Sequence, residues 1–480
     1  MSETTSTIRS FGFFLNGNWH TQGREAVVTS PYDHSILAVI SEAGRDDVEN
    51  AIESAVQAFA VTRKMSSYQR AGVLWKIVEG ITARREEFAR TICQEAAKPI
   101  KTARIEVERA INTFQIAAEE STRIYGEYIP LDTTASTAGR WGLMRRFPLG
   151  PVFAITPFNF PLNLVAHKVA PAIAAGCPII LKPAPQTPIS SFLLAEVVHD
   201  AGWPDGALAV LPLSNDDAGV LVADDRIKLL TFTGSAAVGW QLKSRAGKKR
   251  VVLELGGNAG VIVHSDADLK YAVHRSIVGG FSYGGQTCIS VQRILVHQPV
   301  FEKFLHLLVE GVGQLKCGDP MLETTDIPPL IREQDAVRLT GWINEAVEAG
   351  AKLLCGGKRK GSLVEPTVLT GTAPNMRVNC AEAFGPVVTV ERYETFEEAL
   401  SIINNSVYGL QAGLMTHDAT LIQTAFDELE VGSLIVGDVP SFRVDQMPYG
   451  GVKDSGFGRE GLRFSIEDMT ERKLLVMAPR

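Results

Sequence analysis

The amino-terminal quarter of the chain carries hydrophobic residues at helical spacing. Within residues 44–59, the apolar positions that recur every three or four residues are Val48, Ala51, Ile52, Ala55, Val56 and Phe59. Residues that recur in this way fall on one face of a helix. A second helical region is predicted from about residue 68 to residue 120, with a break near Pro99, because proline has no amide N–H to donate within a helix.

The pattern changes at Gly150, where short apolar runs begin to alternate with amphipathic stretches. The runs cover residues 152–156, 178–182, 207–211, 227–232 and 251–255. Buried strands separated by helical crossovers are typical of a parallel, doubly wound sheet. Ligands bind such sheets at the carboxyl ends of the strands, so we expect the loops after these runs to form the site.

A second α/β region is predicted from Val261 onward. It contains helices at 269–281, 301–315 and 397–404 and strands at 289–296, 387–392 and 432–436. Residues 125–146 alternate in the manner of an extended hairpin, and residues 472–477 form one more strand at the tail. Because an isolated hairpin is marginally stable, we expect these two segments to pair with each other and with another subunit.

Length and composition indicate a globular protein of two large domains. The 480 residues exceed what one hydrophobic core supports, and 45% are hydrophobic and 21% charged. The net charge of −7 gives no reason to expect nucleic acid or an anionic membrane as a partner. The N-terminus lacks the pattern of a secretory signal, and the longest apolar stretch, 169–181, is interrupted by Pro171 and Pro178.

The six cysteines lie far apart, at positions 93, 177, 288, 317, 355 and 380. Their spacing matches neither a zinc site nor a disulfide framework, so we expect no metal centre and a location in the reducing cytoplasm. A small buried hydrophobic residue is the default interpretation of each cysteine.

Two residues stand out as candidates for chemistry. Cys288 follows two glycines in GGQTC, and a thiol in such a loop can be activated as a nucleophile; the alternative is a buried structural cysteine. Glu254 interrupts the apolar run VVLEL, although glutamate is rare in strands. It is either one half of a structural ion pair or a general base whose pKa is raised by apolar surroundings.

Three further segments follow predicted strands. The amide of Asn159 could donate a hydrogen bond to a developing oxyanion, or simply serve a turn beside prolines. Lys182 ends the second strand, where a cation suits a phosphate or a ribose. Residues 232–239 (FTGSAAVG) have strand–turn–helix character, and the free amides at a helix N-terminus favour a pyrophosphate.

Read together, these segments resemble the aldehyde dehydrogenase superfamily over essentially the whole chain, from FLNGNW (14–19) to the tail strand. The ordered motifs are ITPFNFP (155–161), LKPAPQTP (181–188), FTGSAAVG (232–239), LELGGN (253–258), GGQTC (284–288), AEAFGP (381–386) and PYGGVKDSGFGREG (448–461). Each motif is weak alone, but the ordered set is specific. The resemblance implies an α/β fold with a doubly wound cofactor domain (1–126 and 148–255), a second α/β catalytic domain (256–464) and a small β oligomerisation element (127–147 and 465–480).

The resemblance also implies roles for individual residues. Cys288 would be the nucleophile and Glu254 the base, while Asn159 and the backbone N–H of Cys288 would form the oxyanion hole. Lys168 and Glu460 match positions that pass protons away from the base. Residues that match cofactor-binding positions are Ile155, Thr156, Pro157, Phe158, Lys182, Pro185, Gly234, Ser235, Val238, Leu255, Gly256, Glu382 and Phe384. Glu382 is expected at the nicotinamide ribose, and Phe158 stands where the family commonly has tryptophan.

The implied reaction oxidises an aldehyde to its carboxylic acid. A thiolate attacks the carbonyl, hydride passes to the nicotinamide, and water activated by the glutamate hydrolyses the resulting thioester. Relatives that pass the acyl group to coenzyme A generally lack this glutamate, so its presence favours hydrolysis. A coenzyme A-acylating enzyme is one alternative, and a non-catalytic scaffold is another.

The cofactor and the substrate are less constrained by the motifs. Pro185 stands where NAD-preferring relatives often carry a glutamate, which predicts that NADP+ is accepted alongside or in place of NAD+. The segments 288–297 and 438–451 resemble the lactaldehyde dehydrogenase-like branch, so a small aliphatic, hydroxy- or carboxy-aldehyde is expected. Ser282 replaces an arginine of many succinate semialdehyde dehydrogenases. Arg443 either holds a carboxylate, phosphate or hydroxyl of the substrate or is a surface arginine. We expect a homodimer or homotetramer.

Overall fold

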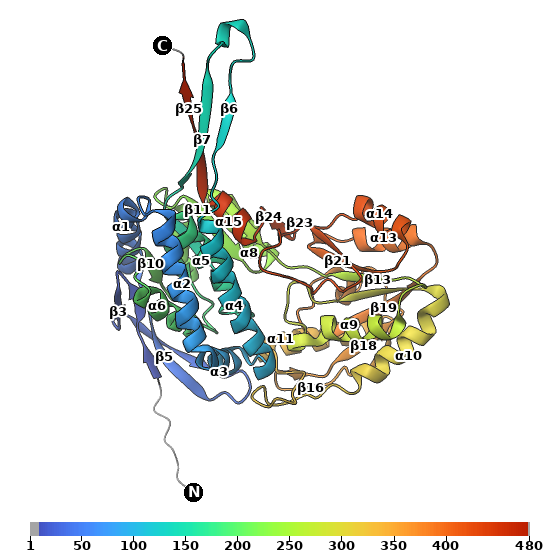
Figure 1. The fold of residues 1–480 in the computed structure, drawn as a ribbon. Helices are drawn as coiled ribbons and strands as arrows, with labels where there is room; N and C mark the ends of the chain where they lie inside the picture. Colours follow the sequence, from blue (N-terminus) through green and yellow to red (C-terminus); the bar gives the residue numbers. More distant parts are fainter. Residues whose placement is uncertain (1–8, 479–480) are drawn as a thin grey trace.

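The computed structural model describes residues 9–478. The chain forms two lobes, each built around a mostly parallel sheet, and a three-stranded element that projects away from both lobes (Figure 1). The predicted α/β class is confirmed. No helix among residues 9–478 is long and apolar enough to cross a membrane.

The first lobe contains an eight-stranded sheet in the order β24-β12-β11-β8-β9-β10-β2-β3. Its five parallel strands are β8 (Val152–Ile155), β9 (Ile179–Lys182), β10 (Leu208–Val210), β11 (Leu229–Thr233) and β12 (Arg250–Glu254). These correspond to the five predicted runs. The crossover helices are α5 (Asn163–Ala175), α6 (Ile189–Asp200), α7 (Asn215–Ala223) and α8 (Ala236–Arg245). The strand order reverses between β8 and β11, which is where ligands bind in sheets of this type.

Helices and short strands from the N-terminal part of the chain complete this lobe. The strands are β1 (Arg9–Phe11), β2 (Phe13–Leu15), β3 (Asn18–His20), β4 (Arg24–Thr29) and β5 (Ile36–Glu42), none of which the hydrophobic pattern predicted. The helices are α1 (Arg45–Thr62), α2 (Ser67–Ala83), α3 (Arg85–Ala96) and α4 (Ile100–Ser121). The predicted break near Pro99 is confirmed, and Ala97 there adopts a left-handed conformation.

A buried ion pair fixes the start of α5 against α4. Glu106 of α4 pairs with Lys98, and both side chains are fully buried. Glu106 also accepts hydrogen bonds from the backbone amides of Leu162 (3.0 Å) and Asn163 (3.1 Å), which have no partner within the helix. The carboxylate therefore holds the end of the loop that connects β8 to α5, and this loop carries Asn159.

The second lobe contains a seven-stranded sheet in the order β15-β18-β19-β14-β13-β21-β22. Its strands are β13 (Gly260–Val263), β14 (Arg293–His297), β15 (Lys352–Cys355), β18 (Thr367–Thr370), β19 (Val387–Tyr393), β21 (Gln411–Met415) and β22 (Ser433–Val436). The helices are α9 (Leu269–Phe281), α10 (Phe301–Val312), α11 (Glu333–Glu348), α12 (Arg377–Cys380), α13 (Phe396–Asn404) and α14 (Ala419–Glu428). Short two-stranded pairs are β16 (Arg359–Lys360) with β17 (Leu363–Val364) and β20 (Tyr408–Gly409) with β23 (Val452–Lys453).

Two predicted elements of this lobe are longer than the structure shows. The strand expected at 289–296 begins only at Arg293, because the amide of Val291 bonds back to the carbonyl of Gly279 at the end of α9. The helix expected at 301–315 ends at Val312.

The projecting element consists of β6 (Glu127–Pro130), β7 (Trp141–Pro148) and β25 (Thr470–Met477). The predicted pairing of hairpin and tail is confirmed, since β7 and β25 pair antiparallel along their whole lengths. Before the tail, β24 (Gly456–Phe457) returns to the first sheet and α15 (Leu462–Asp468) follows it. The assignment of residues 256–464 to a single catalytic domain stays a prediction. The strand β24 lies within these residues but pairs with the sheet of the first lobe.

Candidate active site

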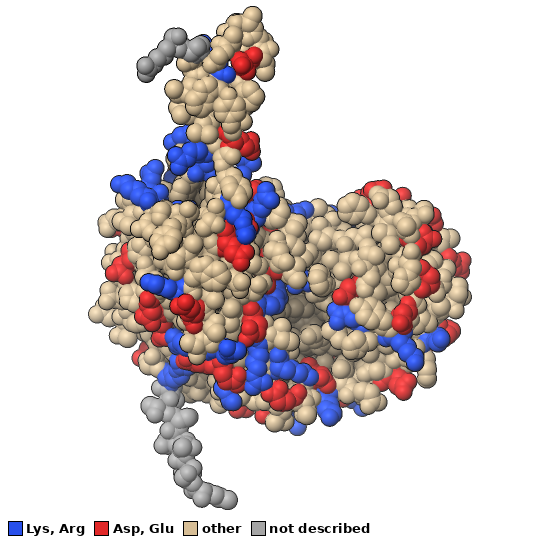
Figure 2. All heavy atoms as spheres, viewed as in Figure 1, with Lys and Arg blue, Asp and Glu red and all other residues tan. Residues whose placement is uncertain are grey.

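A cavity of about 330 Å³ lies at the carboxyl ends of the first-lobe strands, and the molecular surface is hollowed between the two lobes (Figure 2). Predicted site residues that line this cavity are Pro157, Phe158, Asn159, Gly234, Ser235, Glu254, Leu255, Gly256, Cys288, Glu382, Phe384 and Arg443. They come from segments spread over nearly 300 positions of the sequence, and folding brings them together.

The Cys288 loop is shaped by left-handed backbone conformations. Tyr283, Gly284 and Gly285 have φ values of 53°, 61° and 71° in succession. A Cβ at position 285 would lie 2.2 Å from the carbonyl oxygen of Gly385, so only glycine fits this turn. The turn presents the Cys288 sulfur to the cavity, where it lies 2.9 Å from the hydroxyl of Tyr449. Burial raises the pKa of the Cys288 thiol to about 11, although the hydrogen bond from Tyr449 opposes the rise.

Glu254 ends β12 and is 3% exposed. Neither of its carboxylate oxygens has a hydrogen-bond partner among the described residues, so the alternative of a structural ion pair is wrong. Burial, and then the nearby negative charge of Glu460, raise the pKa of Glu254 well above its ordinary value. A Cβ at Gly450 would approach the Glu254 carboxylate to 2.7 Å, so the glycine leaves space for this side chain.

Asn159 lies in the loop after β8 and is 3% exposed. Its amide nitrogen donates to the carbonyl of Gln286 at 2.9 Å, two residues before Cys288. This bond orients the amide towards the Cys288 loop. One of the two amide hydrogens is used here, so the second can serve another acceptor.

Glycines and a carboxylate form the opposite wall. Glu382 is packed so closely on Gly256 that a Cβ there would lie 2.2 Å from its oxygen, and it accepts a hydrogen bond from the amide of Gly257 at 3.1 Å. Burial raises the pKa of Glu382 to about 7. The rings of Phe158 and Phe384 meet edge to face beside it, with centroids 5.9 Å apart.

Five predicted cofactor residues lie outside this cavity. Ile155 and Thr156 lie at the end of β8 and just after it, Lys182 ends β9, and Val238 is 43% exposed on α8. Pro185 lines a separate depression that also contains Glu95. All five lie at the carboxyl edge of the first sheet or on the helix that follows β11, and their roles stay predictions.

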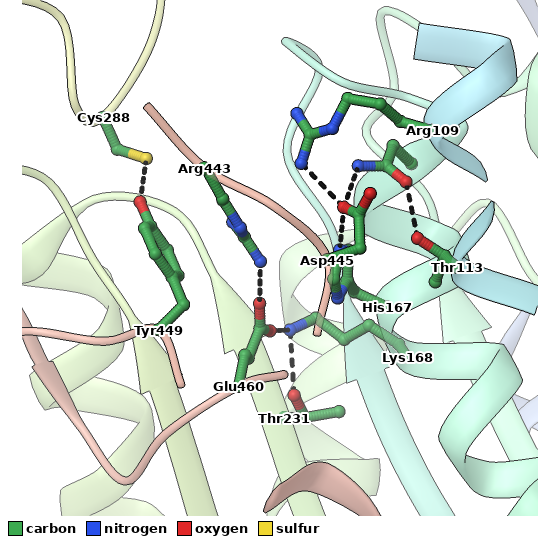
Figure 3. A network of polar contacts seen from close by, with 11 residues as sticks. Arg109, Thr113, His167, Lys168, Thr231, Cys288, Arg443, Asp445, Tyr449 and Glu460 are labelled. Atoms are coloured by element: carbon green, nitrogen blue, oxygen red, sulfur yellow. Dashed lines mark hydrogen bonds and ion pairs between the residues drawn. The ribbon is translucent and has the colours of Figure 1, made fainter. Parts of the chain in front are cut away.

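Behind the cavity wall, Glu460 joins two cations (Figure 3). One oxygen accepts from Lys168 at 2.5 Å and the other from Arg443 at 3.2 Å. Burial opposes ionisation of Glu460, but Lys168 and then Arg443 hold its pKa down at about 2. The Arg443 side chain is only 8% exposed, so the alternative of a surface arginine is wrong. Lys168 also donates to Thr231 at 2.9 Å.

A second network forms around Asp445, two residues after Arg443 (Figure 3). One oxygen of Asp445 faces the Arg109 guanidinium (2.7 Å), the His167 ring (2.9 Å) and the Asn163 amide (3.3 Å). Arg109 belongs to α4 and lines the cavity, whereas Asn163 and His167 belong to α5. Asp445 therefore ties the loop that carries Arg443 to two helices of the first lobe.

Comparisons with known proteins agree with this geometry. Residues 19–475 match the aldehyde dehydrogenase family. The chain belongs to the aldehyde dehydrogenase family. A 3-sulfolactaldehyde dehydrogenase from Priestia megaterium is 45% identical over 471 residues, which is 98% of each chain. The crystal structure of aldehyde dehydrogenase 21 from Physcomitrella patens with the reaction product succinate is 47% identical, with a TM-score of 0.97 over 98% of this chain and 99% of that one.

A third similar protein is the glyceraldehyde-3-phosphate dehydrogenase GapN from Methanocaldococcus jannaschii, solved as a complex with NADP. It is 37% identical, with a TM-score of 0.92 over 95% of this chain and all of that one. This chain is thus an NAD(P)-dependent aldehyde dehydrogenase, and the sulfolactaldehyde relative agrees with the predicted lactaldehyde-like branch.

One predicted substrate residue of this aldehyde dehydrogenase does not lie at the site. Ser282 is exposed and does not line the cavity, because it ends α9 just before the left-handed turn directs the chain inward. The identity of this residue therefore carries no information about substrate contact here.

Three residues of the site were missed from the sequence. Tyr449 was seen only as part of the PYGG motif, and Asp445 only as part of the loop before it. Arg109 has a signal that could have been used: Glu106, Arg109 and Thr113 recur at helical spacing on α4. Polar residues that repeat on the buried face of an amphipathic helix indicate a polar cavity beside it.

The charge of Asp445 should stabilise the fold in a pH-dependent way. Burial disfavours the carboxylate, but its contacts with His167 and Arg109 hold the pKa of Asp445 well below its ordinary value. A group with a lowered folded-state pKa contributes stability above its unfolded pKa of about 3.9 and loses that contribution as the pH falls. We expect Asp445→Asn to lower the free energy of unfolding by about 3 kcal/mol at pH 7, and the difference from the parent enzyme to shrink towards pH 3.

Denaturant unfolding at several pH values measures this difference. Asp335→Asn is the matched control, because Asp335 pairs with Arg332, whose side chain is 47% exposed, and such a pair is worth about 0–1 kcal/mol. A destabilisation by Asp445→Asn that stays constant between pH 7 and pH 3 would contradict the assignment.

Proposed function

We propose that this enzyme oxidises a small aldehyde that carries a carboxylate or sulfonate group, with Cys288 as the nucleophile. The observation that carries the proposal is a pair of arginines at the cavity wall. Arg109 and Arg443 both line the cavity that contains Cys288. Within residues 9–478, the buried Nε atom of each has no hydrogen-bond partner, which leaves donors for an acidic group of the substrate.

The named substrates and products of similar proteins support this substrate class. A sulfolactaldehyde carries a sulfonate, and succinate is the product bound in the Physcomitrella patens structure. Both compounds are short and place an anion a few bonds from the reacting carbon. The cavity of about 330 Å³ suits a substrate of this size beside a nicotinamide.

In the proposed reaction, the Cys288 thiolate attacks the aldehyde carbonyl carbon and forms a carbon–sulfur bond. The carbonyl oxygen becomes an oxyanion, and the amide of Asn159 and the backbone N–H of Cys288 donate to it. Each such donor is typically worth about 3–4 kcal/mol of transition-state stabilisation. A nicotinamide bound beside Cys288 would supply the hydride acceptor, and loss of the hydride from the same carbon leaves a thioester on Cys288.

Glu254 then serves as the base for hydrolysis of the thioester. Because its carboxylate is buried without a donor, it takes a proton from water readily once it is ionised. Water attacks the thioester carbon, and the thiolate leaves as the acid forms. Glu460, Lys168 and Thr231 form a hydrogen-bonded chain, and Glu460 lies near enough for its charge to raise the pKa of Glu254, which supports the proposed passage of the proton away from the site.

The residues around Glu382 and α8 fit a dinucleotide. Glu382 offers a carboxylate to ribose hydroxyls, and the backbone amides that follow Ser235 open a helix of ten residues, where an anion is favoured. Phe384 and Phe158 close the wall beside them. Pro185 offers no negative charge near the edge of β9, so we propose that NADP+ is used, alone or together with NAD+.

We propose further that the enzyme is a homodimer or homotetramer assembled through β6, β7 and β25. The side chains of Leu474, Leu475, Val476 and Met477 are 42–53% exposed on a strand that projects from the body, and Tyr128 on β6 is 66% exposed. Exposed apolar side chains gathered on a projecting element mark a surface for contact with another chain. All six cysteines are free, which supports a reducing compartment such as the cytoplasm.

Replacing Glu254 tests the hydrolytic step. In Glu254→Gln, hydride transfer should still occur once per site, because the thioester forms without the base. We expect a burst of about one reduced cofactor per subunit, followed by steady turnover about 100-fold or more below that of the parent enzyme. Rapid-mixing absorbance at 340 nm measures both phases.

The pH dependence of the hydrolysis rate tests the role of Glu254 in a second way. Because the pKa of Glu254 is raised, the hydrolysis rate of the parent enzyme should increase with pH as the carboxyl group ionises, and this increase should be absent in Glu254→Gln. Full steady-state turnover by the variant would remove Glu254 as the base. Parent activity that requires coenzyme A as the acyl acceptor would instead show an acyl-transferring enzyme.

Replacing Arg443 tests the choice of substrate. Arg443→Ala removes a charged donor to the substrate anion, a contact typically worth about 1.5–3 kcal/mol, so KM for succinate semialdehyde or sulfolactaldehyde should rise at least about tenfold. KM for propanal, which has no anion, should change by less than about threefold. Steady-state kinetics with the three aldehydes measure the ratio.

Arg338→Met is the matched control for this experiment. Arg338 also lines the cavity, but it donates to the carbonyl of Ala383 beside Glu382. Its replacement should affect charged and neutral aldehydes equally. An equal effect of Arg443→Ala on all three aldehydes would contradict its role as an anion anchor.

Replacing Pro185 tests the cofactor preference. We expect the parent enzyme to use NADP+ with at least one tenth of the kcat/KM that it shows with NAD+. In Pro185→Glu, the new carboxylate should repel the 2′-phosphate and lower kcat/KM for NADP+ about tenfold or more, with a smaller change for NAD+. A parent enzyme that uses NADP+ more than tenfold less efficiently than NAD+ shows that this interpretation of Pro185 is wrong.

A further inference from the structure

Tyr449 is the closest polar neighbour that the structure gives the Cys288 sulfur. The two atoms lie 2.9 Å apart, and Figure 3 shows the phenol pointing at the thiol. Tyr449 is 1% exposed. Its hydroxyl makes no hydrogen bond other than this one within the part of the chain that the structure describes.

The position of this hydroxyl is set by its backbone. The Tyr449 amide donates to the carbonyl of Glu460 at 3.0 Å, and the Glu460 amide donates back to Tyr449. Above the ring, the guanidinium carbon of Arg443 lies 3.6 Å from the centroid. The phenol is therefore held between a β-bridge and a stacked cation, and its orientation does not depend on substrate.

We propose that Tyr449 is a catalytic residue whose hydroxyl donates a hydrogen bond to the Cys288 thiolate and so increases the fraction of the nucleophile that is ionised. This inference rests on the proposed role of Cys288. A phenylalanine would line the cavity equally well, so the hydroxyl is the part of the side chain that acts on the sulfur.

The chemistry of the two groups fixes the direction of this bond. A thiolate has no proton and can only accept, so the phenol must donate. Burial raises the pKa of Tyr449 well above its usual range, which keeps the proton on the phenol while the cysteine ionises. The cation of Arg443 above the ring draws electron density towards itself and strengthens the O–H donor. Tyr449 transfers no proton in this step.

The expected effect on rate is moderate because two consequences oppose each other. Removing a hydrogen bond to a charged group should raise the thiol pKa by about one to two. Each rise of one in the thiol pKa lowers the thiolate fraction at neutral pH about tenfold. The remaining thiolate is about threefold more nucleophilic, so the acylation rate should fall about threefold for each such step.

The test measures the pH profile of Cys288 alkylation by iodoacetamide in the full-length enzyme, read by mass spectrometry of the Cys288 peptide. In Tyr449→Phe, the midpoint of the profile should lie about one pH unit or more above that of the parent enzyme. Replacing Tyr449 with 3-fluorotyrosine makes the phenol a stronger donor, and the midpoint should move down. Other charged groups that face the sulfur are Arg443, Glu254 and Glu382. These are present in every variant, so the difference between profiles reports the hydroxyl alone.

Tyr393→Phe is the matched control, because this buried phenol bonds to His264 in the core of the second lobe. Its Cys288 midpoint should equal that of the parent enzyme. Equal midpoints in Tyr449→Phe and the parent would overturn the proposal, and so would an equal movement in Tyr393→Phe. A separate outcome addresses the proposed function itself: if enzyme fully alkylated at Cys288 keeps its dehydrogenase activity, Cys288 is not the nucleophile.

Discussion

The shared edge at which β8, β11 and β12 end is the constraint on which the site depends. Parallel strands in register deliver the loops that follow them to one place, so Asn159, Ser235 and Glu254 meet although they lie far apart in the sequence. The second lobe adds the Cys288 loop and Glu382 across the same gap. No single segment contains a working set of groups, and the fold supplies their convergence.

Two neighbouring carboxylates of the site, Glu460 and Glu254, have opposite surroundings. Glu460 is surrounded by Lys168 and Arg443, which keep it ionised. Glu254 receives no donor, and the negative charge of Glu460 adds to its burial in favouring the protonated form. Two acids that titrate far apart allow one to remain a fixed charge while the other exchanges protons, which is the arrangement that acid–base chemistry requires. A buried charge without partners is costly, so this contrast marks a functional site better than either residue does alone.

The sequence predicted the parallel strands of the first lobe well, because each is a short apolar run bounded by helices. It missed β1–β5; β1, β3 and β4 are largely exposed and carry no regular apolar alternation, and β2 is only three residues long. Cys288, Glu254 and Asn159 could be proposed because each lies in a motif beside the end of a strand. Asp445 could not, because its contact with Arg109 spans more than 300 positions of the chain, and Arg109 offered only the polar positions that repeat on its helix. The prediction that Ser282 contacts the substrate was wrong for a related reason. The distance between Ser282 and Cys288 along the chain does not reveal the left-handed turn between them.

One oxygen of Asp445 is shared by Arg109, Asn163 and His167, and this has a consequence for redesign of the enzyme. Groups that satisfy a common partner do not change independently, so substitutions at these positions will be strongly non-additive. A variant that replaces Arg109 must also provide another partner for Asp445, or leave this buried charge without one of its contacts. Changing this wall of the cavity one position at a time therefore removes a partner of Asp445 at each step, so these positions have to be redesigned together.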